Sequence, residues 1–300
     1  MNHLDAMRAR RSVRTFDGSA LRAEDREKIL RCAEIAENPY AIPITWRLLD
    51  GKAHGLSSQV IVGTETYIAG KVRRVPYAEE AFGYSFERID LLAQTIGVGM
   101  TCIAGTMDRG AFEKAMELGE GEVMPCVSPL GYPAEKMSLR ESLMRKGVRA
   151  DSRLSFGELF FDGGSDTPLT PAGAGKLKDA LEAVRLAPSA VNKQPWRVIL
   201  RGDKVHFYEK RTRGFVSADG WDTQKIDMGI ALCHFALAAE EGGIKTVFTL
   251  DDPGLTSDAE YIASYVVSYE ILRIKSASCL REKTRAGRRS IISGEGRQKR

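Results

Sequence analysis

The chain has 300 residues, of which 43% are hydrophobic and 28% charged, and its formal net charge is +4 at pH 7. These values describe an ordinary soluble globular protein with about two domain-sized units. They argue against a membrane protein, because no apolar stretch reaches the ~18 residues that a membrane-spanning helix requires. The first residues also lack the apolar core of an export signal.

Five cysteines and four histidines bear on the compartment and on metal chemistry. The cysteines are odd in number, lie far apart and form no Cys-x-x-Cys pair, which favours a reducing environment. The histidines show no zinc-binding spacing. We therefore expect a cytoplasmic protein without a metal site.

The first motif along the chain is the arginine cluster Arg10-Arg11-Ser12-Val13-Arg14. Guanidinium groups bind phosphate oxygens through forked, charge-assisted hydrogen bonds, and the Ser12 hydroxyl can add a further donor. The segment therefore predicts a phosphate site. The alternative is a solvated basic segment on a helix.

A helix, a loop and a strand follow in the first half. The helix is predicted by an apolar face formed by Ile29, Leu30, Ala33 and Ala36. A proline-containing loop over 38–45 leads to a strand-like run at 46–49. Further on, residues 92–97 predict a helix that ends at a glycine before another strand-like run.

The second half offers the same order of elements. Thr170-Pro171 predicts a helix start, because threonine is a good N-cap and proline suits the first helical position. The apolar face of this helix comprises Leu177, Ala180, Leu181, Val184 and Ala187. After a loop, residues 196–201 and 205–208 predict a β-hairpin. Residues 237–242 then repeat the helix that ends at a glycine.

This shared order predicts an internal duplication. Trp46 and Trp196 begin equivalent strands 150 positions apart (196 − 46). We expect one half over 1–162, a Gly-Ser-rich linker over 163–168, a second half over 169–278 and a basic, disordered tail over 279–300. Because strands and helices do not alternate regularly, the expected class is α+β.

The loop between the second helix and its hairpin combines two prolines with polar side chains. Pro188 and Pro195 restrict the backbone, while Ser189, Asn192 and Gln194 supply neutral donors and acceptors suited to a polar heteroaromatic ring. The alternative is a helix-ending loop that is merely stiffened by its prolines.

Together these motifs resemble the nitroreductase family of flavin enzymes. The family hallmarks, Arg-x-Ser-x-Arg and Ala-Pro-Ser-x-x-Asn-x-Gln-Pro-Trp, match residues 10–14 and 187–196, and the stretches 97–105 and 130–136 also look familial. In ordinary members both hallmarks lie close together in one subunit of an intertwined homodimer. Here they lie in different halves, so the chain resembles such a dimer fused into one polypeptide, with helices around mixed or antiparallel sheet.

The resemblance implies one FMN per chain, bound between the halves of a monomeric pseudo-dimer. Ala104 would place its backbone N–H near the flavin N5, and Arg153 would reach the phosphate, with Lys146 and Arg149 as competing candidates. The implied cofactor-binding residues are Arg10, Arg11, Ser12, Arg14, Ile103, Ala104, Gly105, Arg153, Pro188, Ser189 and Asn192.

The implied reaction is a ping-pong transfer of hydride from NADH or NADPH, through the flavin, to a nitroaromatic, a quinone or a similar electron-poor small molecule. No catalytic side chain is expected, since the flavin is the reacting centre. The alternatives are other FMN chemistry, such as dehalogenation or flavin fragmentation, and a non-catalytic flavin sensor. We expect no nucleic-acid partner, because the arginine clusters lack interleaved aromatic residues.

Overall fold

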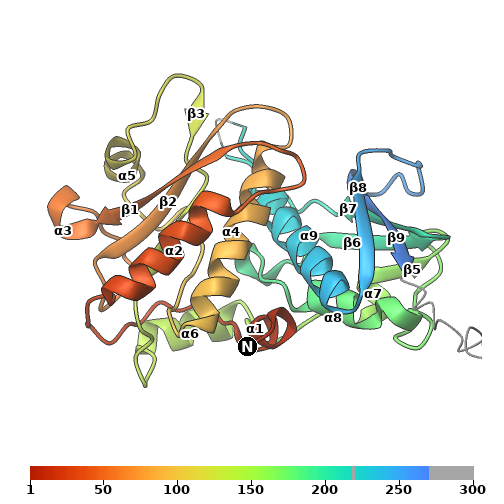
Figure 1. The fold of residues 1–300 in the computed structure, drawn as a ribbon, viewed down its shortest axis with the longest axis horizontal. Coiled ribbons are helices and arrows are strands. Elements are labelled where there is room, and N and C mark those ends of the chain that lie inside the picture. Colours follow the sequence, from red (N-terminus) through yellow and green to blue (C-terminus); the bar gives the residue numbers. More distant parts are fainter. Residues whose placement is uncertain (218–219, 270–300) are drawn as a thin grey trace, which may run out of the picture. The chain divides into compact units, whose positions relative to one another are not determined.

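The computed structural model describes residues 1–217 and 220–269. Residues 270–278 of the expected second half, and the expected tail over 279–300, lie outside this part of the chain. The described elements form two β-sheets with helices packed between and around them (Figure 1). This arrangement confirms the predicted α+β class.

The first sheet is built from residues of the first half. Strand β2 (Thr66–Arg73) lies at its centre and pairs antiparallel with β1 (Ile44–Asp50), β3 (Glu122–Val123) and β4 (Val127–Leu130). Trp46 faces Gly70 across β1 and β2. A Cβ atom at Gly70 would come within 2.6 Å of the indole ring, so the glycine leaves space for that side chain.

The second sheet has five strands in the order β5-β6-β7-β9-β8. They are β5 (Phe160–Asp162), β6 (Trp196–Arg201), β7 (Lys204–Glu209), β8 (Ile244–Thr249) and β9 (Glu260–Tyr269). Strand β5 runs parallel to β6, and the other pairs are antiparallel. The predicted hairpin is confirmed, because β6 and β7 pair along their whole length around Gly202 and Asp203.

Two long helices, α4 (Ala78–Thr95) and α9 (Thr223–Glu241), cross at the centre of the described fold (Figure 1). Each contributes a glycine to the crossing. A Cβ atom on Gly83 would lie 2.0 Å from the carbonyl oxygen of Ile226, and one on Gly229 would lie 2.0 Å from that of Glu80. The two backbones therefore touch directly, which only residues without a side chain permit.

The remaining helices surround these layers. They are α1 (His3–Ala9), α2 (Ala23–Ile35), α3 (Gly51–His54), α5 (Arg109–Ala115), α6 (Leu139–Gly147), α7 (Phe156–Leu159) and α8 (Lys178–Leu186), with the 3₁₀ turns η1 (Gly175–Leu177) and η2 (Ala190–Asn192). Within the described residues, no helix combines the length and the apolar character needed to span a membrane.

Two sequence expectations are wrong in detail. Helix α8 begins at Lys178 rather than at Thr170-Pro171, and the Thr170 hydroxyl instead accepts the N–H of Gly173 at 3.1 Å in a separate turn. Gly175 has a φ of +54°, which breaks helical geometry before α8 begins. The run after α4 forms isolated bridges, such as Gly99 with Gly131, rather than a strand.

Candidate functional site

Two adjoining cavities bring the sequence motifs of both halves together. The larger has a volume of about 950 Å³ and the smaller about 280 Å³. The residues that line both are Arg10, Ser12, Arg14, Met144, Pro188, Ser189 and Val191. The arginine cluster and the proline-containing loop, about 180 residues apart in sequence, therefore face the same space.

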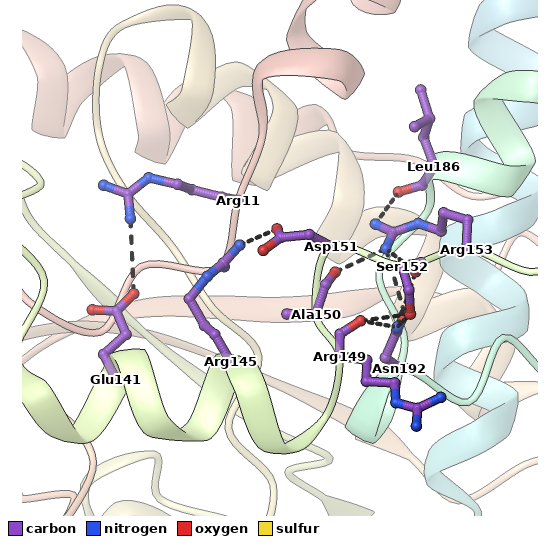
Figure 2. A network of polar contacts seen from close by, with 10 residues as sticks. All are labelled: Arg11, Glu141, Arg145, Arg149, Ala150, Asp151, Ser152, Arg153, Leu186 and Asn192. Atoms are coloured by element: carbon purple, nitrogen blue, oxygen red, sulfur yellow. Dashed lines mark hydrogen bonds and ion pairs between the residues drawn. The ribbon is translucent and has the colours of Figure 1, made fainter.

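The smaller cavity is strongly cationic. Its lining includes the arginines Arg10, Arg11, Arg14, Arg145 and Arg153. Among the residues that the structure describes, Asp151 is the one acidic residue that lines it, and it pairs with Arg145 (Figure 2). Burial lowers the pKa of Arg14, an effect that Glu141 opposes. Positive charge held in a partly enclosed space is suited to a phosphate group.

Donor groups in this cavity are left without protein partners among the residues described. The Nη1 atom of Arg11 and the Nε atom of Arg153 are buried and make no hydrogen bond. Arg11 has only a long ion pair, 3.8 Å from the Oε1 atom of Glu141 (Figure 2). Buried donors normally find an acceptor, so these two guanidinium groups, which belong to residues that line the cavity, keep hydrogen-bonding capacity that the described residues do not use.

Arg10 is held from behind by acidic residues of α4. Its guanidinium lies 3.3 Å from Asp90 and 3.9 Å from Glu87, and Glu87 in turn contacts His234 of α9 at 2.7 Å. Burial raises the pKa of Asp90 to about 7, although the charge of Arg10 opposes the effect. Sequence reasoning missed this network, whose signal was a pair of acidic residues three positions apart in a largely apolar helix.

The 187–195 loop is held by its own polar side chains. The Ser189 hydroxyl accepts the N–H of Gln194 at 2.8 Å, and the side-chain oxygen of Gln194 accepts the N–H of Leu154 at 2.9 Å. Both carboxylate oxygens of Asp227 in α9 lie about 3 Å from the N–H of Ala190. Val191, Asn192 and Gln194 have φ of 50°, 56° and 51°. The loop is therefore held in an unfavourable backbone conformation by side-chain contacts.

Arg153 and Asn192 join this loop to the segment that follows α6 (Figure 2). Arg153 lies 3.5 Å from the Oδ1 atom of Asn192 and donates to the Leu186 carbonyl at 3.2 Å. The Asn192 amide donates to the carbonyl of Arg149 at 2.7 Å. Of the three predicted phosphate candidates, Arg153 lines the smaller cavity, whereas Lys146 and Arg149 are not among its lining residues. Arg145, which sequence reasoning did not propose, also lines it.

The segment 101–106 forms a wall of the larger cavity. Arg109 supports it by donating to the carbonyl oxygens of Ala104 at 2.8 Å and Met124 at 2.7 Å. A Cβ atom added to Gly105 would meet no atom within 4 Å, so the protein leaves open space beside this backbone. Ile103, Ala104 and Gly105 thus border a space that a planar ring system could enter closely.

The chain is similar to known proteins in both sequence and fold. The model of a family described as "Putative TM nitroreductase" matches residues 2–239. A solved structure of a "putative nitroreductase" from Thermotoga maritima is 18% identical, covers 89% of this chain and 93% of its own, and superimposes with a TM-score of 0.58. This likeness confirms the expected nitroreductase-like fold. No curated protein matches the chain.

Two other solved structures match a little less than half of the chain. A "Putative NADH dehydrogenase/NAD(P)H nitroreductase" from Bacteroides thetaiotaomicron is 23% identical over 45% of this chain and 89% of its own, with a TM-score of 0.40. An "FMN-dependent nitroreductase" from Clostridium difficile is 16% identical over 44% of this chain and 88% of its own, with a TM-score of 0.39.

Proposed function

Because this chain belongs to the Putative TM nitroreductase family, we propose that it is an FMN-dependent oxidoreductase that uses NADH or NADPH to reduce electron-poor small molecules. The observation that carries the proposal is the pair of adjoining cavities, one cationic and one larger and bordered by open backbone. This pairing matches a phosphate at one end of a ligand and a ring system at the other.

The residues of this chain have separate tasks in the proposed complex. Arg11, Arg14 and Arg153 bind the phosphate, and Ser12 adds a hydroxyl donor at the junction of the cavities. Arg10, anchored by Asp90 and Glu87, places positive charge beside both cavities. Pro188 and Ser189 border the ring from the second half of the chain.

Ile103, Ala104 and Gly105 would border the ring, and the backbone N–H of Ala104 would be a donor to it. When bound, FMN supplies the redox chemistry: it takes hydride from a nicotinamide and passes it to the acceptor. The protein contributes orientation, exclusion of water and fixed donors around the ring, which stabilise negative charge on the reduced cofactor.

We further infer that each chain holds one FMN, because the two halves differ at the motifs. The reciprocal contacts of Gly83 and Gly229 between α4 and α9 support a duplicated origin. The first half's equivalent of the 187–195 loop carries Tyr40, whose ring lies 5.4 Å from that of Tyr77 and 4.8 Å from that of Phe248. Aromatic packing thus takes the place of the polar loop there.

The visible absorption spectrum of the purified protein tests this function. A yellow protein with one FMN per chain, whose absorbance bleaches under anaerobic NADH or NADPH, supports the proposal. A flavin that does not bleach would indicate a binding or sensor role, and two flavins per chain would contradict the asymmetric site. A colourless protein that cannot be reconstituted with FMN would refute flavin binding.

A further inference from the structure

Two cysteines lie next to each other in the wall of the larger cavity. Cys102 is exposed and lines the cavity, whereas Cys126 is completely buried behind it. Ile103 and Val127 form an antiparallel bridge between their segments, with N–H to carbonyl distances of 2.8 and 3.0 Å. Continuing this register puts Cys126 opposite Ala104, so Cys102 and Cys126 are diagonal neighbours on one face.

The register of this bridge brings the two thiols near each other. Burial raises the pKa of Cys126 well above its usual value, and the neighbouring Cys102 adds to this effect. Both cysteines carry free thiols. A disulfide requires a Cβ separation of about 3.5–4.5 Å, which is shorter than the usual separation of diagonal neighbours, so the two segments must move closer together to form it. An isolated bridge between Ile103 and Val127, rather than a long ladder, joins them there.

We propose that Cys102 and Cys126 are a redox-active dithiol that hydroperoxides convert to a disulfide in the cavity wall. The proposal goes beyond the oxidoreductase function and does not depend on bound flavin. It assigns Cys102 as the thiol that meets the oxidant and Cys126 as the thiol that resolves the product.

The chemistry balances in two steps. The Cys102 sulfur attacks the hydroperoxide, the O–O bond breaks, and the products are a sulfenic acid and an alcohol, or water when the oxidant is hydrogen peroxide. The Cys126 sulfur then attacks the sulfenic sulfur, and the hydroxyl group leaves as water with the Cys126 proton. Two thiols lose two electrons in total, and the hydroperoxide is reduced by two.

Burial shields Cys126 from the oxidant, although the raised pKa of its thiol slows its attack on the sulfenic acid. Its sulfur is out of reach of solvent, so an oxidant does not compete for it. The disulfide would tie segment 101–106 to the irregular segment that leads into β4. Segment 101–106 also carries Ile103, Ala104 and Gly105, so oxidation would restrict the wall that we expect to border the flavin.

Peptide mapping of the full-length protein tests the proposal. Reduced protein is treated with hydrogen peroxide, its remaining thiols are blocked with N-ethylmaleimide, and the chain is digested with trypsin. Cleavage after Arg88, Arg109, Lys114 and Lys136 puts the two cysteines on separate peptides, 89–109 and 115–136. We expect a linked pair of these peptides whose mass is two hydrogens less than their sum and which dithiothreitol separates.

Single-cysteine variants test which thiol reacts with the oxidant and which then attacks the sulfenic acid. In Cys126→Ser we expect Cys102 to stop at a sulfenic acid that dimedone labels, and in Cys102→Ser we expect Cys126 to stay unmodified. Cys32→Ser serves as a matched control, because Cys32 is half-buried and makes its contact with the Arg88 carbonyl. That variant should form the linked peptides as the unaltered protein does.

Several results would overturn the proposal. One is oxidation of Cys102 to a sulfinic acid in the unaltered protein while the Cys126 thiol stays free. Another is a Cys102 linked only to cysteines of other chains, or not oxidised at all. Should Cys126→Ser fail to fold, the mapping of the unaltered protein and of Cys102→Ser still separates these outcomes.

Discussion

The carboxylate of Asp227 in α9 holds the backbone N–H of Ala190, with its two oxygens at 3.1 and 3.0 Å. Asp227 is 5% exposed, and burial raises its pKa well above the usual range. The contact ties the 187–195 loop, with its left-handed residues, to the central helix of the second half. One buried hydrogen bond thus connects the core to the wall of both cavities.

Replacing Asp227 with leucine should therefore loosen the loop. The Ala190 N–H would lose its acceptor, and a buried donor left without a partner costs about 1–3 kcal/mol. We expect the dissociation constant for FMN, measured by fluorescence titration of the apoprotein, to rise by about tenfold or more. Asp227→Asn is the matched control because it keeps an acceptor oxygen. Equal weakening in both variants would show that the charge of Asp227, not its hydrogen bond, is what matters.

Arg153 should contribute strongly to phosphate binding. A hydrogen bond to a charged group contributes about 1.5–3 kcal/mol, so Arg153→Met should weaken FMN binding by roughly 10- to 150-fold. Riboflavin, which has no phosphate, should bind the variant and the unaltered protein with similar affinity. Arg149→Met is the control, since Arg149 contacts Asn192 through its carbonyl oxygen. Riboflavin binding that falls as much as FMN binding would place Arg153 away from the phosphate.

The helix crossing predicts a large effect of a single methyl group. Gly83→Ala would put a Cβ atom 2.0 Å from the Ile226 carbonyl oxygen, so the helices must move apart. Such overpacking typically costs about 1–3 kcal/mol or more of unfolding free energy. Gly147→Ala in α6 is the control, because its Cβ atom would meet nothing within 4 Å. Chemical denaturation that shows similar stability for both variants would contradict the close crossing.

Glu80 in α4 predicts a pH dependence of stability. Burial raises its pKa from 4.5 to about 7, an effect that Lys225 partly offsets. Between these values the folded protein keeps a proton that the unfolded chain has lost. The stability that Glu80 contributes is therefore fully present below pH 4.5 and is lost as the pH rises through about 7.

Glu80→Gln should remove this pH-dependent contribution to the free energy of unfolding. The slope of unfolding free energy against pH between 5 and 7 should become shallower by up to about 1.4 kcal/mol per pH unit, as measured by urea denaturation. Glu34→Gln, which alters an exposed side chain of α2, should leave the slope unchanged. A Glu80→Gln profile parallel to that of the unaltered protein would mean that Glu80 titrates near its ordinary value.

Much of the local structure could be predicted from the sequence, because its causes are local. Two apolar runs on either side of the Gly202-Asp203 turn favour a hairpin whatever surrounds them, and β6 and β7 form there. Dense positive charge at Arg10 to Arg14 needs no tertiary context to favour an anion. The start of a helix is harder to predict from sequence, because a threonine such as Thr170 can cap a turn as well as a helix. Here the glycines that follow Thr170 favour the turn.

Other features of the site depend on tertiary packing alone. Arg10 meets Asp90 because α1 packs against α4, and Ala190 meets Asp227 because η2 packs against α9. Cys102 lies near Cys126 because Ile103 and Val127 pair. Apart from the acidic pair in α4, none of these partners is marked by spacing or composition, since each contact joins segments that are distant in sequence. The sequence determined which groups could bind phosphate and flavin; the packing of helices and strands decided which of them share a cavity and which side chains hold them there.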